Sequence, residues 1–431
     1  MKQPEQPEVL PLGPWTGVDT VDDATAAVFQ PGQESPAALR AAVNVDLDRG
    51  GWPRRRAGRT KRLALSDGHS LTSVGGRLLL VDAGVLVEVD PQTWTTRAIT
   101  ACPGDAAVSF GEAGGEIFWS NGTLTGRITA DGLAAPWGLA PPRIAVQATT
   151  GGVLLPGRYL VAATAETLDW IESGAAETLV VEVRDQGAIN VSLSQHDPAA
   201  TMINLYVSDA DAKVPFFVGV FAADEFPITL RQVGLTTDAL DGLGLAPPPA
   251  GQRIAFYRGR ALVAAGDVLY WSQPLAYHRF DIQVDLQLFD GRNTLLEPLD
   301  DGFYFGTPTA TYWIAGEDPE TWQPILVDRR AVAEGPALRM AGRALPALEF
   351  DGPVLVWASE DGFLAGLPGG QVMPLNPGKV AMDAPAQATL AYRESPGLRQ
   401  ILLGLRERGA ASHLASSDRV SCSVIKAGAI E

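Results

Sequence analysis

The chain has 431 residues, of which 46% are hydrophobic, so it can bury a sizeable core and is not disordered throughout. Its 50 acidic and 33 basic residues give a formal net charge of −17. This charge argues against a general nucleic-acid binder, which needs Lys and Arg to displace counterions from phosphates, and against adhesion to anionic membranes. It leaves open an acidic wall that repels DNA and lets it slide.

The amino-terminal segment and the cysteines exclude several classes of protein. The first twelve residues are rich in Pro and Glu and have no apolar signal core. No apolar run reaches the ~18 residues of a membrane-spanning helix. Cys102 and Cys422 form neither a disulfide framework nor a metal-ligand pattern, and a bridge between them stays an open alternative. We therefore expect synthesis in a reducing cytoplasm without membrane insertion.

A basic stretch follows an irregular lead segment, residues 1–35. In residues 44–63, alternating apolar and acidic residues run into a Gly-Gly turn and then a basic strand. Such a strand either contacts an acidic face of a neighbouring subunit or is an edge strand whose charges block unwanted pairing. The interface candidates are Arg54, Arg55, Arg56, Arg59, Lys61 and Arg62.

An internal repeat begins after this stretch. Each unit has a Gly-containing turn, an apolar run, a turn of small residues and a second apolar or aromatic run, which is typical of a β-hairpin. The units are residues 75–89, 114–128, 259–271, 301–314 and 351–367. Two of them continue into similar turns, VDPQTW at 89–94 and EDPETW at 317–322. Spacings of roughly 40–50 residues match the four-stranded blades of a propeller; an array of β-sandwiches is the alternative.

One segment interrupts the repeat. Residues 141–235, followed by the Pro-rich run at 247–251, have the alternating strands of a fibronectin type III or immunoglobulin-like sandwich. We predict an all-β chain: a β-propeller of about six blades with this sandwich inserted. Its parts are the irregular segment 1–35, a first propeller part 36–140, the sandwich 141–235 and a second propeller part 236–431. Pairing of residues 53–63 with 388–405 would close the ring.

A search for catalytic, cofactor or metal sites finds none. His69, His196, His278 and His413 lack a second His or Cys at metal-ligand spacing, and neither a nucleophile elbow nor a phosphate loop is present. Residues 208–213 (SDADAK) lack the glycine and final Glu of an EF-hand loop, which favours a solvated turn over a calcium site. The sequence thus predicts a protein that is not an enzyme and needs no cofactor.

Acidic and aromatic residues leave two further hypotheses open. A glycosidase-like propeller would need a pair of carboxylates, yet Asp281, Asp285, Asp300 and Asp301 fit turn or strand positions, and residues 359–366 match an Asp-box turn only weakly. Four tryptophans recur at similar places in the repeats and could stack on carbohydrate, although core packing is favoured. They are Trp119, Trp271, Trp313 and Trp357.

The basic stretch also carries a resemblance to a known group of proteins. The pattern N-V-D-x-D-x-x-G-x-x-R-R-R-x-G resembles the start of a group of phage virion proteins in which propeller blades follow. It comprises Asn44, Val45, Asp46, Asp48, Gly51, Arg54, Arg55, Arg56 and Gly58. Residues 270–281, 296–323 and 415–431 are similar to the same group.

This resemblance implies a tail nozzle, hub or stabilisation protein of a short-tailed phage, located in the virion. Such proteins assemble as homo-oligomers, commonly hexameric rings, around the DNA channel below the portal and adaptor. Their partners are other tail proteins and, in passage, genomic DNA, and there are no enzymatic residues to carry over. The alternatives are a carbohydrate-binding propeller for host adhesion and a glycosidase-like propeller enzyme.

Overall fold

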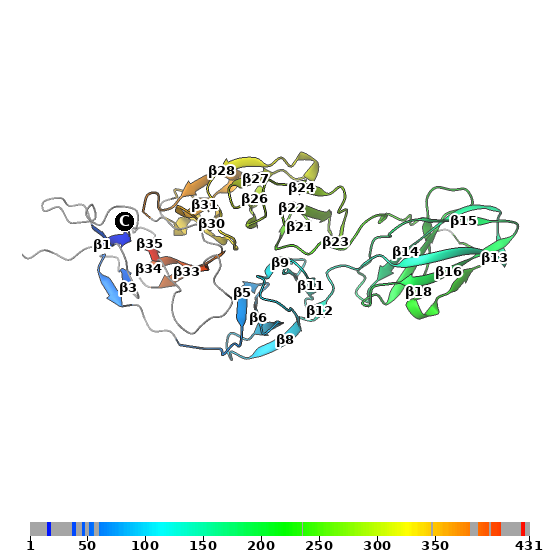
Figure 1. The fold of residues 1–431 in the computed structure, drawn as a ribbon, viewed down its shortest axis with the longest axis horizontal. Helices are drawn as coiled ribbons and strands as arrows, with labels where there is room; N and C mark the ends of the chain where they lie inside the picture. The colour runs from blue at the N-terminus through cyan, green and yellow to red at the C-terminus, as the bar shows by residue number, and fades with distance from the viewer. Residues whose placement is uncertain are drawn as a thin grey trace, which may run out of the picture. The chain divides into compact units, whose positions relative to one another are not determined.

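The computed structural model describes residues 15–18, 37–39, 45–47, 51–55, 60–234, 236–345, 348–379, 387–395, 398–406 and 424–426. Over these residues the chain is all-β, built from many small sheets whose strand pairs are almost all antiparallel (Figure 1). Its helical turns are η1 (Ala223–Glu225), η2 (Pro319–Thr321), η3 (Gly342–Ala344) and η4 (Pro368–Gly370). None of the described helices is long and apolar enough to cross a membrane.

The chain divides into two compact units. Unit 1 combines Met1–Arg62 with Asn293–Glu431, and unit 2 is Leu63–Arg292. Unit 2 contains three sheets in which each strand pairs mainly with its neighbour in sequence. The first has β5 (Gly68–Val74), β6 (Arg77–Asp82), β7 (Val85–Val89) and β8 (Thr96–Ala101). The second has β9 (Ser109–Ala113), β10 (Glu116–Ser120), β11 (Thr125–Ile128) and β12 (Ala134–Ala135). The third has β20 (Arg253–Tyr257), β21 (Arg260–Ala265), β22 (Val268–Gln273), β23 (Ala276–Phe280) and β24 (Leu286–Leu288).

Tight turns set the strand order of these sheets. Gly75 and Gly76 join β5 to β6 with positive φ at both positions (55° and 70°), as the two-residue turns that match the twist of a hairpin require. Neighbouring sheets then share a core: Leu79 and Trp119 pack in one cluster between the first and second sheets. Phe118 and Val263 do the same between the second and third.

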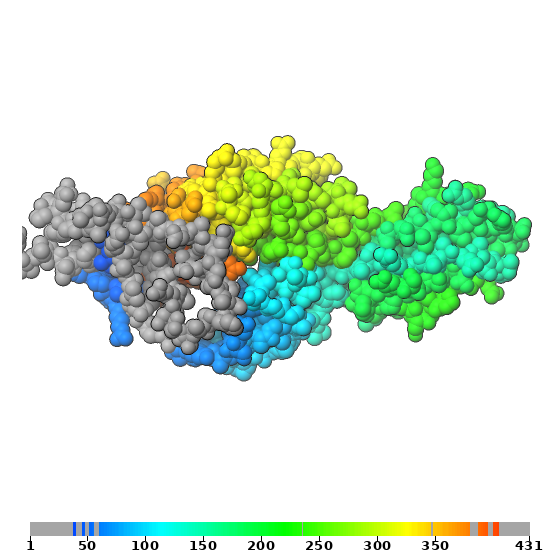
Figure 2. Space-filling view, viewed as in Figure 1, coloured from blue at the N-terminus to red at the C-terminus, as the bar shows by residue number. Residues whose placement is uncertain are grey.

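Seven strands between β12 and β20 form the inserted sandwich. One sheet has the order β13 (Arg143–Leu154), β16 (Gly187–Gln195), β19 (Ile228–Leu230). The other has the order β15 (Leu179–Val183), β14 (Gly157–Glu166), β17 (Met202–Val207), β18 (Phe216–Ala222). Alternate apolar residues of both sheets, such as Val161, Ile189 and Leu205, are fully buried in one cluster. Figure 2 shows the atoms of this insert, teal to green, packed together over the face in view.

Unit 1 contains three further sheets and two short strand pairs. The sheets are β25 (Leu295–Pro298), β26 (Gly302–Gly306), β27 (Thr311–Ala315), β28 (Ile325–Asp328); β29 (Leu338–Ala341), β30 (Pro353–Ser359), β31 (Gly362–Gly366), β32 (Val372–Pro374); and β33 (Gln387–Ser395), β34 (Leu398–Arg406), β35 (Val424–Lys426). β1 (Trp15–Val18) pairs with β2 (Ala37–Leu39), and β3 (Val45–Leu47) with β4 (Pro53–Arg55). Shared clusters again join neighbouring sheets: Tyr304 packs with Trp357, and Val356 with Leu403.

The five predicted hairpins and the all-β class are confirmed. The hairpins are β6–β7, β10–β11, β21–β22, β26–β27 and β30–β31. The predicted pairing of residues 53–63 with 388–405 is wrong in the described residues. There β4 pairs with β3, while β34 pairs with β33 and β35. The nearby β3 is the favoured partner, because closing the short loop to it costs less entropy than pairing with residues 388–405 would.

Candidate functional site

The motif of the amino-terminal region folds as the β3–β4 hairpin, with Asp46 opposite Arg54. Asp46 is buried, and its carboxylate accepts a hydrogen bond from Nε2 of Gln400 (3.2 Å). The guanidinium of Arg393 lies 3.6 Å from the same carboxylate. Since Gln400 is on β34 and Arg393 on β33, one acidic side chain ties the motif to the carboxyl-terminal sheet of unit 1.

The basic half of the motif faces solvent instead. Arg54 and Arg55 are exposed on β4, and Lys61 and Arg62 are exposed beyond it. The other two interface candidates, Arg56 and Arg59, lie outside the described residues. The hairpin therefore divides the motif into a buried acidic anchor and an exposed basic strand, a geometry that suits contact with another molecule.

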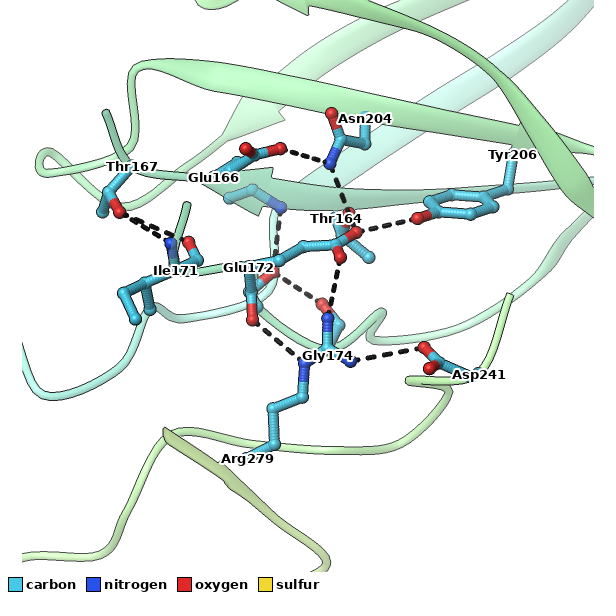
Figure 3. Close-up of polar contacts among 12 residues, drawn as sticks. Thr164, Glu166, Thr167, Ile171, Glu172, Gly174, Asn204, Tyr206, Asp241 and Arg279 are labelled. Atoms are coloured by element: carbon cyan, nitrogen blue, oxygen red, sulfur yellow. Dashed lines mark hydrogen bonds and ion pairs between the residues drawn. The ribbon is translucent and has the colours of Figure 1, made fainter. Parts of the chain in front are cut away.

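A second polar site lies at the base of the sandwich and centres on Glu172 (Figure 3). Its carboxylate accepts hydrogen bonds from Thr164 Oγ1 (2.5 Å), Tyr206 Oη (2.8 Å) and Asn204 Nδ2 (3.2 Å). Arg279 of β23 completes the site: Nη2 lies 2.8 Å from Glu172 Oε2, and Nε donates to the Glu172 backbone oxygen at 3.1 Å. The network joins the sandwich to the third sheet of unit 2.

The charges in this network stabilise one another. Burial alone would raise the pKa of Glu172, but the hydrogen bonds from Thr164, Tyr206 and Asn204 and the charge of Arg279 bring that pKa below its usual value. Asp241, on the segment after the sandwich, lies 3.3 Å from the other guanidinium nitrogen of Arg279. Glu172 is thus held as a carboxylate whose lone pairs are occupied by fixed donors.

A matching arginine connects the sandwich to the second sheet. The side chain of Arg127, on β11, is 3% exposed; its Nη1 lies 2.5 Å from Glu116, and its Nε donates to the Pro136 oxygen at 3.0 Å. Its Nη2 pairs with the carboxylate of Asp169, on the sandwich loop after β14. Removing one partner of such a pair would leave an uncompensated buried charge, so both arginines hold the sandwich in place.

His278 lies beside these two arginines, and its pKa is strongly shifted. Burial, followed by the charges of Arg279 and Arg127, lowers its pKa to about 4. It is therefore neutral near pH 7. Of the other three, His69 and His196 contact Ser70 and Asp197 through Nδ1, and His413 lies outside the described residues.

The four recurring tryptophans are all buried, at 1–9% exposed. Trp119, Trp313 and Trp357 each pack against a glycine whose added Cβ would lie within 2.7 Å of the ring: Gly126, Gly302 and Gly366. Buried rings of this kind do not present a face on which a sugar could stack. They close the cores between strands and sheets, which is the role favoured from the sequence.

The acidic candidates occupy turns. Asp281 accepts two backbone N–H groups of its own loop at 3.1 Å, from Gln283 and Val284. Asp300 pairs with Arg339 at 3.2 Å, and Asp301 accepts the backbone N–H of Gly369 at 2.7 Å. Asp285 instead accepts from Gln273 Nε2 at 2.6 Å. Within the described parts of the chain, no group of three or more His, Cys, Asp and Glu side chains could hold a metal ion.

Two sequence questions have partial answers. Asp211, in the 208–213 segment, accepts the backbone N–H of Arg158 at 3.1 Å, as a hairpin-turn residue does. Cys102 is buried, and burial raises the pKa of its thiol. Cys422 lies outside the described residues, so a bridge between the two cysteines stays an open alternative.

The sequence does not reveal the residues that link the sandwich to the neighbouring sheets, which we call the junction: Arg127, Asp169, Glu172 and Arg279. Arg279 and Glu172 are 107 positions apart, and neither belongs to a motif of known spacing. The only local signal is that each is a charged residue directly next to a large apolar side chain, Ile171 before Glu172 and Phe280 after Arg279. Such residues are exposed far more often than paired, so this signal is weak.

Comparisons with known proteins give weak structural likenesses only. No protein-family model matches the chain, and no curated protein matches it. The computationally designed Ika8 protein is 11% identical, with a TM-score of 0.29 over 80% of this chain and 96% of that one. The N-terminal domain of Nup159 is 10% identical, with a TM-score of 0.29 over 82% and 75% of the two chains. Sqt1 of Saccharomyces cerevisiae is 9% identical, with a TM-score of 0.22 over 68% and 81%.

Proposed function

We propose that this chain is a structural subunit of a phage tail, a nozzle or hub ring below the portal and adaptor through which DNA leaves. In this proposal the six sheets of three to five strands outside the sandwich are blades of a propeller, and the sandwich is an immunoglobulin-like insert. The described sheets support the blades through their strand order and the cores that neighbouring sheets share within each unit. The protein acts as a binding scaffold without chemistry of its own.

The β3–β4 hairpin is the observation that carries the proposal. It is the segment that resembles the phage virion proteins, and it buries Asp46 against Gln400 and Arg393 while exposing Arg54 and Arg55. A hairpin anchored on one side and cationic on the other suits a contact with an acidic neighbouring subunit. The net charge of −17 supports the proposed passage of DNA through the ring, because acidic channel walls would repel DNA and keep it mobile.

The experiment is mass photometry and negative-stain microscopy of the purified chain, alone and mixed with portal and adaptor proteins. We expect a ring of fixed copy number, six in the simplest case. A particle that stays monomeric under both conditions would refute the proposal. Glycan binding or turnover of aryl glycosides by the monomer would instead favour host adhesion or a glycosidase, although neither gains support from the buried tryptophans or the turn-bound Asp300 and Asp301.

A further inference from the structure

The loop after β14 presents the most exposed large apolar side chains of the described residues. Trp170 is 83% exposed and Leu168 is 79% exposed. Exposed apolar residues scattered singly need no explanation, but two within three residues form a small hydrophobic tip. We name the side chains of Leu168 and Trp170 the apolar tip.

The loop that carries the tip is held rigid from inside. Thr167 is buried; its N–H donates to the Ile171 oxygen (3.0 Å), its oxygen accepts from the Trp170 N–H (3.1 Å), and its hydroxyl donates to Asp169 (2.5 Å). Asp169 in turn pairs with the buried Arg127. The residue between the two apolar ones is therefore fixed to the second sheet, so the tip loses little conformational entropy when it binds.

Trp170 has a backbone conformation that disfavours a bulky side chain. Its φ is +65°, where a residue of this kind is strained by on the order of 1–3 kcal/mol. Asn or Gly would adopt this conformation at lower cost, yet the position holds the largest apolar side chain, pointed at solvent. An exposed ring on a strained backbone is best explained by a contact that the ring makes with another molecule.

Negative charge surrounds the base of the tip. The two networks contain five carboxylates and two guanidinium groups. Glu116 and Asp169 pair with Arg127, Glu172 and Asp241 pair with Arg279, and Glu166 accepts a hydrogen bond from Asn204. Three negative charges are left over. A complementary surface is therefore cationic and has groups that pack on an indole ring, for which the arginine side chain is the best match.

We propose that the apolar tip of one copy of this chain docks on the basic stretch of a second copy. The basic stretch comprises the exposed residues Arg54, Arg55, Lys61 and Arg62, the one dense basic segment in a chain of net charge −17. This inference rests on the proposed assembly into a ring and names the surfaces that form it. Because the two surfaces differ, the contact is head-to-tail, the type that closes into rings.

A sugar is a poorer occupant of the tip. Sugar platforms combine an aromatic face with polar groups that are free to bond to hydroxyls. Here the carboxylate of Asp169 bonds to Thr167 and Arg127, and the hydroxyl of Thr167 is turned inward. What remains at the surface is apolar area and negative field, and Trp and Arg are the residues that dominate protein–protein contacts.

The first test changes the tip and measures assembly by mass photometry over a concentration series. Trp170→Asn removes the ring and suits a positive φ, so the variant should fold, and its association should be about tenfold to a hundredfold weaker, as for a central interface residue. The matched control is Leu275→Asn, since Leu275 is 78% exposed at φ 58° on the β22–β23 turn. The control should assemble like the wild type.

The second test identifies the contacted surface. A photo-crosslinking amino acid at position 170, in full-length protein mixed from isotopically light and heavy copies, should yield mixed-label crosslinks to peptides that contain Arg55 or Lys61. Crosslinks elsewhere, or rings that form equally well with Trp170→Asn, would overturn this inference and leave the ring proposal standing. A monomeric wild type would overturn both, and glycan binding lost in Trp170→Asn with assembly unchanged would assign the tip to a sugar.

Discussion

A few charged side chains at the base of the sandwich link it to the neighbouring sheets of unit 2. Glu172 receives four side-chain donors from three different segments, and Arg127 and Arg279 link it and Asp169 to neighbouring sheets. Misplacing one partner of such a buried pair is costly, because the other partner is left as a desolvated, uncompensated charge. The orientation of the sandwich on its neighbouring sheets therefore depends on a few residues.

The neutral His278 makes this junction sensitive to acid. Its folded pKa is about 4 against an ordinary value of 6.5, so the unfolded chain binds more protons than the folded chain between these pH values. Stability therefore falls as the pH drops from about 6.5 to 4. By pH 4 the free energy of unfolding has fallen by about 3 kcal/mol more than that of a variant without the imidazole.

The check is chemical denaturation of wild type and His278→Gln between pH 7.5 and 4. The difference between their free energies of unfolding should narrow or reverse in favour of the variant as the pH falls. Protonation of Glu172 and Asp169, whose folded pKa values are lowered, removes further stability at lower pH in both proteins. A difference that does not change with pH would show that His278 is not held neutral in the junction.

At the scale of strands and sheets, the tryptophan–glycine contact recurs as a packing device. Trp119 faces Gly126 directly across β10 and β11, while Trp357 lies over Gly366 of the adjacent β31. The missing side chain lets a large ring lie flat on the neighbouring strand. Tyr304 of the neighbouring sheet packs against Trp357, and the centroids of the two rings are 5.2 Å apart.

Adding one methyl group at Gly366 should disrupt this contact. A Cβ there would lie 2.5 Å from Trp357 and 2.7 Å from Tyr304, and both rings are fully buried. We expect Gly366→Ala to lower the free energy of unfolding by about 1–3 kcal/mol through overpacking. Thermal and urea denaturation would measure the change.

Gly404 provides the control. It is a strand glycine of the same unit whose added Cβ would meet only the Thr389 oxygen, at 3.9 Å. Gly404→Ala should change stability by about 0.5 kcal/mol or less. Combining Gly366→Ala with Trp357→Leu should cost less than the sum of the two single changes, since they share one site. Equal effects of the two Gly→Ala changes would contradict the packing explanation.

At the scale of the whole molecule, the sandwich has a core of its own within unit 2. Its buried cluster draws on residues from Leu139 to Leu230, and the segment after it pairs back at Phe217 and Ala175. By contrast, the cores of the other sheets are shared between neighbours. The insert thus has what an independent domain needs, whereas a single outer sheet does not.

A fragment of residues 138–247 should accordingly fold alone. We expect a β-type circular dichroism spectrum, dispersed NMR amide signals and one cooperative transition. Its melting temperature should lie below that of the sandwich in the full chain, because Arg127 and Arg279 are absent. Glu172→Gln should lower the melting temperature of the fragment by less than that of the full chain, because in the full chain Arg279 would lose its ion-pair partner. An unfolded fragment would refute the assignment of an autonomous insert.

The five hairpins and the burial of the four tryptophans were predictable because their information is local. Gly75 and Gly76 favour a tight turn whatever surrounds them, and a continuous apolar run such as residues 159–163, around Val161, favours a buried strand. The strand pairing of the basic segment was predicted wrongly. Residues 388–405 were expected to pair with it, whereas in the structure the nearby β3 forms the pair.

The amino-acid sequence by itself determined the β class and the five glycine-containing hairpins, because these depend on residues a few positions apart. Only the tertiary structure decided that Arg279 meets Glu172, that Asp46 meets Gln400, and that Leu168 and Trp170 stay outside every core. The first contact joins residues that are 107 positions apart in the sequence, and the second joins residues that are 354 positions apart. Such contacts form only when whole sheets pack together and close long loops, and no short sequence pattern encodes that packing.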